Sequence, residues 1–512
     1  MGWNVPKDWI PDMSAAFENF CVHTREVALL SSIESLLDWD ARCKLPQQGS
    51  AYRTEQQAYV ARLLHDKQTD PRIGEWLDSL QGTDLTADPQ SDSATVIREA
   101  QRNYDKQTKL PAELVEALTR ATNDGQHAWV EARRENNFSQ FLPYLETVYA
   151  LKREQADAIG YDECRYDALL DDYEPGEKTS TVREALEALR QDLVPLLESI
   201  QGSGRVPDRS ILTRDYPVEL QEKFGRKAAK EIGFEFDRGR LDVTHHPFCT
   251  EAGPDDCRIT TRYDSNFFNM AFFGILHEAG HGIYDQGLRK SQYGLGPGHY
   301  LSLGIHESQS RMWENQVGRG KPFWDYWYAQ AQQEFSSLSG VALDEFYFAI
   351  NHVEPSLIRV EADELTYNLH IIIRFELEQA LINEEIVPAD LPEAWNAKYQ
   401  QYLGIQPPSD ADGVMQDVHW SAGLVGYFPT YSLGNLYAAQ FYQQADKELG
   451  GLDELFRRGQ FLELKHWAGE KIHQRGRNVT PAELVVEVTG EPLTHTHLMK
   501  HLKSKLEPLY GI

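Results

Sequence analysis

Two histidines and a glutamate near the middle of the chain have types and spacing that suit metal chemistry. In "HEAGH", residues 277–281, His277 and His281 lie four positions apart, so a helix places both imidazoles on one face, one turn apart. Glu278 follows His277 directly and can reach a water held by the same ion. The spacing predicts a zinc site that activates water. The alternative is a buried helix whose histidines bond to backbone carbonyls.

A catalytic zinc site needs a third protein ligand and one open position. The segment "GIHESQSRMWEN", residues 304–315, offers Glu307, which we take as that ligand, with Glu314 as the next choice. His299 and Asp285 are weaker candidates. Asp285 lies one turn beyond His281 on the same helix, where it orients a ligand or is simply solvated. We therefore expect His277, His281 and Glu307 to surround one ion.

The elements that must position these residues are predicted to be mainly helices. Apolar residues recur at intervals of three and four in long windows, whereas short β-branched runs just before "HEAGH" are typical of strands. No break between these segments is long enough to be a free linker, so we predict one helical domain over residues 1–512, with two lobes around a groove and a small sheet at its edge. The helical windows are 17–40, 54–67, 182–201, 220–234 and 365–386, and the strand-like runs are 240–244 and 257–263.

Composition and charge narrow the class of protein. The chain has 79 acidic and 50 basic residues and a net charge of −29, which repels phosphate backbones and anionic lipids, so we expect neither nucleic acid nor membrane partners. We find no signal or transit peptide and no apolar stretch long enough to span a bilayer. The five scattered cysteines lack a C-x-x-C pair, which indicates neither a disulfide framework nor a thiolate zinc site. We predict a cytoplasmic protein with reduced thiols.

The chain also resembles the carboxypeptidase Taq family of zinc metallocarboxypeptidases, over nearly its whole length. Besides "HEAGH", five motifs follow that family's order, and three further segments echo it. The motifs are "HPF" (246–248), "DCRIT" (256–260), "HESQ" (306–309), "IRVEAD" (358–363) and "GVMQDVHW" (413–420), and the further segments are "LLDWD" (36–40), "YDALLDDYEPG" (166–176) and "GYFPTYSLG" (426–434).

This resemblance implies a saddle-like, mainly α fold with a deep active-site groove, similar to the folds of neurolysin and angiotensin-converting enzymes. It also implies a homodimer that needs zinc or cobalt and removes single residues from the C-terminus of peptides, with broad specificity. "LLDWD" then indicates lid helices over the groove, within residues 1–75, although ordinary helix packing explains it as well.

Catalytic roles follow from the motif and the resemblance together. Zinc on His277, His281 and Glu307 would lower the pKa of its water and polarise the scissile carbonyl, while Glu278 acts as general base and passes the proton to the leaving amine. The resemblance assigns stabilisation of the oxyanion to a histidine and tyrosines. Those residues correspond here to His419, Tyr427 and Tyr431, and core packing explains either tyrosine equally well.

An exopeptidase must also recognise the free carboxylate of its substrate, and a guanidinium pairs with it in bidentate fashion. Arg258 is our first candidate, held by Asp256 two residues away, although the two could instead simply pair at the sheet edge. Arg359 is the second candidate, and its alternative is an ion pair with nearby acidic residues. His246 closes the groove or binds the substrate's end, unless the proline beside it makes the motif purely structural.

Two other functions remain open at this point. An oligopeptidase or dipeptidyl carboxypeptidase would share the zinc helix and the His/Tyr cluster, although "HPF", "DCRIT" and "IRVEAD" favour release of single residues. A helical binding protein with a structural metal, or with none, would tolerate replacement of Glu278.

Overall fold

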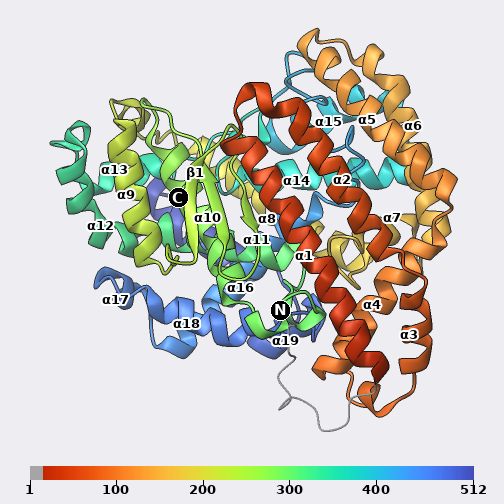
Figure 1. Ribbon diagram of the computed structural model, residues 1–512. Helices are drawn as coiled ribbons and strands as arrows, with labels where there is room; N and C mark the ends of the chain where they lie inside the picture. Colours follow the sequence, from red (N-terminus) through yellow and green to blue (C-terminus); the bar gives the residue numbers. More distant parts are fainter. Residues whose placement is uncertain (1–14) are drawn as a thin grey trace.

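The computed structural model describes residues 15–512 and is built almost entirely from helices, as the sequence predicts (Figure 1). Helices α1 to α7 gather on one side of the molecule, and α9, α12 and α13 lie on the other. The helices are α1 (Ala15–Cys43), α2 (Ser50–Gln68), α3 (Arg72–Leu80), α4 (Asp92–Lys109), α5 (Ala112–Arg134), α6 (Phe138–Ile159), α7 (Arg165–Leu170), α8 (Thr179–Gly202), α9 (Val218–Glu231), α10 (Phe268–Gly287), α11 (Leu303–Arg311), α12 (Lys321–Glu334), α13 (Leu343–Ile350), α14 (Thr366–Ile382), α15 (Leu391–Leu403), α16 (Pro429–Leu449), α17 (Leu452–Arg457), α18 (Leu462–Lys471), α19 (Pro481–Thr489) and α20 (Thr496–Tyr510).

A three-stranded sheet lies beside α10, with the strand order β1-β3-β2. β1 (Gly239–Val243) pairs with β3 (Cys257–Thr261) in parallel, and β2 (Cys249–Glu251) pairs with β3 in antiparallel fashion. The two predicted strands are thus confirmed. β2 was not predicted, because three residues are too short to show a period.

The hydrophobic core has two parts. The larger cluster of buried residues runs from Ala132 to Tyr510, and α14 is buried on nearly every face, including its charged residues Arg374 and Glu378. The smaller cluster joins α1, α3 and α4, so the N-terminal helices have a core of their own. Residues 1–14 of the predicted lid region lie outside the described residues.

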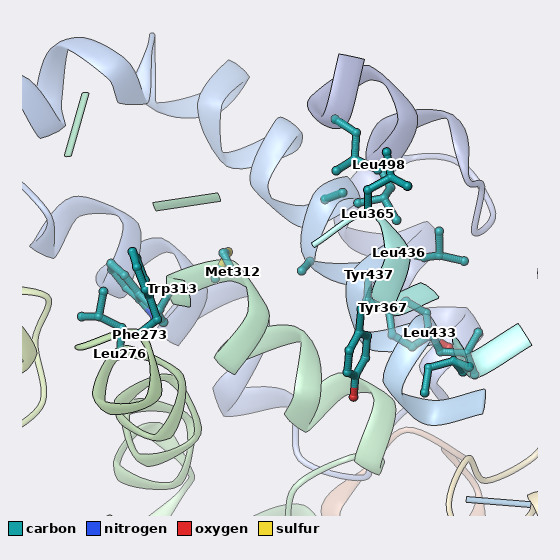
Figure 2. Close-up of a cluster of buried hydrophobic side chains, with 14 of the residues drawn as sticks. Phe273, Leu276, Met312, Trp313, Leu365, Tyr367, Leu433, Leu436, Tyr437 and Leu498 are labelled. Atoms are coloured by element: carbon teal, nitrogen blue, oxygen red, sulfur yellow. The ribbon is translucent and has the colours of Figure 1, made fainter. Parts of the chain in front are cut away.

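The two helices that carry the predicted ligands are fixed by packing on both sides. Figure 2 shows Phe273 and Leu276 of α10 gathered with Trp313, which belongs to the π-helix Met312–Gly318 that directly continues α11. Leu433 and Leu436 of α16 gather at the other side of the view. All five side chains are almost completely buried. This packing makes the ligand-bearing elements rigid.

Two further observations bear on the class of protein. None of the helices described from residue 15 onward combines the length and apolar character needed to cross a membrane. All five cysteines lie within the described residues and are free thiols there.

Candidate active site

His277 and His281 on α10 and Glu307 on α11 converge on one point. Nε2 of His277 lies 3.7 Å and Nε2 of His281 3.4 Å from Oε2 of Glu307, and the three potential ligand atoms lie within 4.8 Å of one another. Nitrogen and oxygen ligands about 2.05 Å from a tetrahedral zinc ion would be about 3.4 Å apart. The donor set therefore fits a divalent cation with one position open.

Glycines allow the helices to approach closely enough for this convergence. A Cβ on Gly280, inside "HEAGH", would lie 2.6 Å from the carbonyl oxygen of Gln309 on α11. A Cβ on Gly434 of α16 would lie 2.5 Å from Cγ of Glu307 itself. Any larger residue at either position would push α11 away, so these two glycines set the position of Glu307.

The imidazoles are oriented by hydrogen bonds on their far sides. Nδ1 of His277 lies 2.9 Å from Oε2 of Glu314, and Nδ1 of His281 lies 2.6 Å from Nδ1 of His306. His306 in turn places Nε2 2.9 Å from Oδ1 of Asp285. When Nε2 of each ligand faces the ion, Nδ1 carries the proton and donates it, so Glu314 and the His306–Asp285 pair fix the tautomers.

The charges at the site follow from burial and from Arg311. Burial alone would raise the pKa of Glu307, but Arg311, whose Nε lies 2.6 Å from Oε1, and the two histidines hold it well below its usual range. Burial raises the pKa of Glu278 to about 7, and the negative charges of Glu307 and Glu314 act in the same direction. Glu307 is thus anionic at the point where the three side chains converge, whereas the pKa of the buried Glu278 carboxyl lies near neutral.

His419, Tyr427 and Tyr431 lie close together. Nε2 of His419 lies 3.5 Å from the Tyr431 hydroxyl, and the rings of Tyr427 and Tyr431 are 5.3 Å apart. The charge of Glu307 contributes to the raised pKa of both phenols, after burial. Neither tyrosine is fully buried, in contrast to a residue that only fills the core.

Arg359 lies beneath this aromatic group in a buried network. Its Nη2 lies 2.8 Å from Oδ1 of Asp417, its Nη1 donates to the hydroxyl of Tyr367 at 3.1 Å, and its guanidinium sits over the Tyr431 ring at 5.1 Å. Arg374 binds the same aspartate through Nε at 2.6 Å. The ion pair expected for Arg359 is therefore present, but its partner is Asp417 and not one of the nearby acidic residues.

The Arg258 side chain lies on the face of β3 that is turned towards α1. Its Nε and Nη2 each lie 2.8 Å from an oxygen of Asp256, and its guanidinium stacks over Trp39 at 4.1 Å. Among the described hydrogen bonds none uses Nη1, which leaves that donor for a further acceptor. Arg240, opposite Arg258 on β1, stacks over the same Trp39 at 4.9 Å.

His246 is exposed in the connection between β1 and β2, and no contact recorded for the described residues links it to the ligands. A cavity of about 590 Å³ lies beside α4, and its lining includes Arg98 and Arg102 but none of the predicted site residues. Neither feature contributes to the cluster around Glu307.

Sequence reasoning missed several members of this network. Arg311 follows Glu307 by four residues, a spacing that predicts a helical ion pair and so could have been found. Tyr367 and Arg374 lie on the buried helix α14, where the Tyr367 hydroxyl accepts from Arg359 and Arg374 donates to Asp417. The Arg374–Asp417 contact joins segments too far apart in the chain to be predicted from local spacing.

Comparisons with known proteins agree with this geometry. The family model for "Carboxypeptidase Taq (M32) metallopeptidase" matches residues 19–506. The chain is 48% identical to thermostable carboxypeptidase 1 of Thermus thermophilus over 97% of this chain and 99% of that protein, and 39% identical to carboxypeptidase 1 of Bacillus subtilis over 95% and 97%. The crystal structure of the M32 carboxypeptidase from Deinococcus radiodurans matches with a TM-score of 0.94 and 38% identity, covering 98% of this chain and all of that one.

A metallopeptidase is thus the class that fold and site define. The chain belongs to the carboxypeptidase Taq (M32) metallopeptidase family and is a metallocarboxypeptidase, which acts on peptides and uses a divalent metal.

Proposed function

We propose that this metallocarboxypeptidase removes single residues from the C-terminus of peptides with broad specificity, using zinc on His277, His281 and Glu307 and Glu278 as general base. The observation that carries the proposal is the convergence of both Nε2 atoms on Oε2 of Glu307 at 3.7 and 3.4 Å, directly beside Glu278. Cobalt would fit the same donor set.

Each residue of the centre then has a defined task. When bound, the metal polarises the scissile carbonyl and lowers the pKa of a water in its open position. Glu278, which is buried directly beside the donor set, would accept the proton of an attacking water and pass it to the leaving amine. Glu314 and the His306–Asp285 pair keep the two imidazoles in the orientation that this requires.

His419 and Tyr431 are proposed to donate hydrogen bonds to the developing oxyanion, with Tyr427 beside them. Burial lowers the pKa of His419 to about 4, although Asp417 opposes this, so the imidazole is neutral near pH 7 and donates from one nitrogen only. Arg359 and Asp417 support this group from below, which makes them positioning residues.

Arg258 is proposed to bind the substrate carboxylate, because its Nη1 is not engaged by Asp256. Arg359 is the alternative, but Asp417 and Tyr367 already occupy its Nε, Nη1 and Nη2. His246 is proposed to contact the end of the substrate or close the groove, and its exposure leaves it accessible for this.

The remaining proposals concern the whole molecule. We propose a cytoplasmic homodimer without nucleic acid or membrane partners, supported by the net charge of −29 and the family resemblance. We also propose a single domain over residues 1–512, whose N-terminal helices cover a deep groove as in the saddle-like folds of neurolysin and angiotensin-converting enzymes.

A product analysis tests the proposed activity. A blocked dipeptide and a longer peptide are incubated with the enzyme, with and without a chelator, and the products are identified by mass. We expect a ladder of products that differ by one residue, lost with the chelator and restored by zinc. Release of dipeptides would support the dipeptidyl carboxypeptidase alternative, and the absence of single-residue steps in the ladder would contradict the proposal.

A further inference from the structure

A second group of metal-binding side chains lies on the far side of the His306–Asp285 pair. It consists of Cys249 on β2, Cys257 on β3 and Asp285 on α10, whose potential ligand atoms lie within 4.8 Å of one another. The two sulfur atoms are 3.7 Å apart, and Oδ2 of Asp285 lies 3.5 Å from Sγ of Cys249 and 4.0 Å from Sγ of Cys257.

These distances suit an ion between the three atoms. Sulfur ligands lie about 2.3 Å and carboxylate oxygens about 2.1 Å from zinc, so a tetrahedral site separates two sulfurs by about 3.8 Å and a sulfur from an oxygen by about 3.6 Å. The observed separations differ from these values by at most 0.4 Å. Small side-chain adjustments would complete the site.

The strand register distinguishes this arrangement from a disulfide. Cys249 lies opposite Ile259, and Cys257 lies opposite Glu251, so the two cysteines are diagonal neighbours on one face of the sheet. Diagonal residues of an antiparallel pair are about 7–8 Å apart, whereas the Cα atoms of a disulfide are usually about 4.4–6.8 Å apart. An ion bridges the longer separation without moving the strands.

The two cysteines of the cluster differ in their surroundings. Cys257 is 2% exposed and faces α10 at Gly282. A Cβ added to Gly282 would lie only 3.2 Å from Sγ of Cys257. Cys249 is half-buried, so an ion can enter from its side. Glu251 lies on the same face of the sheet, opposite Cys257.

We propose that Cys249, Cys257 and Asp285 bind a second, thiophilic divalent cation such as zinc, with Glu251 or a water in the fourth position. On binding, each thiol releases its proton to solvent and coordinates as a thiolate. Asp285 then bonds the ion through Oδ2 while Oδ1 still accepts from His306, so one carboxylate connects this thiolate site to the ligand His281.

Cobalt spectroscopy separates this site from the catalytic one, because the catalytic donor set contains no sulfur. Reduced holoenzyme is titrated with cobalt, and sulfur-to-cobalt charge-transfer absorption is recorded together with metal content. We expect this absorption to appear with about two metals per chain, and zinc to bleach it. Cys249→Ser should remove it and leave about one metal per chain, whereas the control Cys43→Ser, at a partly exposed thiol outside the cluster, should retain it.

Glu307→Ala is the complementary variant to Cys249→Ser. It should lose the catalytic metal and keep the sulfur-to-cobalt absorption. Absence of this absorption in reduced enzyme, or its persistence in Cys249→Ser, would overturn the proposal. So would a native mass lower by two hydrogens together with protection of Cys249 and Cys257 from alkylation, which would identify the pair as a disulfide.

Discussion

Replacement of Arg258 by alanine tests how the enzyme selects a free C-terminus. The Arg258 side chain is 13% exposed, and Asp256 neutralises it through Nε and Nη2 while Nη1 stays available. A substrate carboxylate at Nη1 would form a second charged contact in a largely buried position. The variant removes this contact and leaves the carboxylate without a partner.

The size of the effect follows from the geometry. Two unit charges about 4 Å apart interact by about 4 kcal/mol at an effective dielectric constant of about 20. Asp256 already neutralises part of the arginine charge, so we expect the lower half of the range of about 2–5 kcal/mol for truncating one partner of a buried charge pair. A loss of about 2–3 kcal/mol corresponds to about a 30- to 160-fold lower kcat/KM.

The assay compares the same peptide as a free acid and as a C-terminal amide. The acid-to-amide ratio of kcat/KM should fall by this factor in Arg258→Ala. General damage to the sheet would lower kcat/KM for both substrates equally, so it would leave the ratio unchanged. Arg240→Ala is the matched control. Arg240 lies opposite Arg258, pairs with an aspartate two residues away and stacks over the same Trp39, so its loss should leave the ratio unchanged.

Equal losses on acid and amide substrates would exclude Arg258 from carboxylate binding. A fall of the ratio in Arg359→Ala would then transfer the role to Arg359, although Asp417 and Tyr367 already use its donors.

Four further predictions address the metal, the base, pH and assembly. Glu278→Gln should keep fold and metal but lower turnover at least about a hundredfold, measured by single-turnover kinetics beside metal analysis; retained turnover would contradict the mechanism. Glu307→Ala should lose bound metal, whereas Glu314→Ala should bind it more weakly, about 10- to 100-fold, and equal retention in both would move the third ligand elsewhere. Burial raises the pKa of Glu174 from 4.5 to about 8, so the stability that this group contributes below pH 4.5 is lost as the pH rises towards 8. The Tm of the native protein should therefore fall more between about pH 6 and about pH 8 than the Tm of Glu174→Gln. Parallel curves of Tm against pH for the two proteins would refute this. Light scattering should show a dimer, and a monomer at micromolar concentration would refute that proposal alone.

Local periodicity was sufficient to predict the mainly helical class, five of the long helical segments and two of the three strands. "HEAGH" predicted two ligands because four residues on a helix return to the same face, and the convergence of His277 and His281 depends only on that local rule. Glu307 was a choice among several acidic residues, because the sequence of the loop between α10 and α11 does not determine how the two helices are placed relative to each other. Sequence spacing alone could not have excluded Glu314.

The remaining parts of the site depend on contacts between distant segments. Glu174 shows this well: it lies in a short connection after α7, yet its carboxylate accepts from the Ser302 hydroxyl at 2.9 Å and from the Gly304 amide at 3.0 Å, at the first turn of α11. The same carboxylate accepts from Tyr437 of α16 at 3.0 Å. No periodicity links these three segments, so only the folded structure reveals the contact.

The group of Cys249, Cys257 and Asp285 likewise could not have been predicted from sequence spacing. Seven residues separate Cys249 from Cys257, a spacing that matches no thiolate motif, and Asp285 follows much later in the chain. The sheet register brings the two sulfurs to 3.7 Å, and α10 adds the carboxylate because its face towards β3 carries Gly282 and Asp285 one turn apart. The helix that holds His277 and His281 on one face thus presents Asp285 both to His306 and to the sheet. The two donor sets have no member in common, so a ligand change at Cys249 should be detectable without altering the donor set at Glu307.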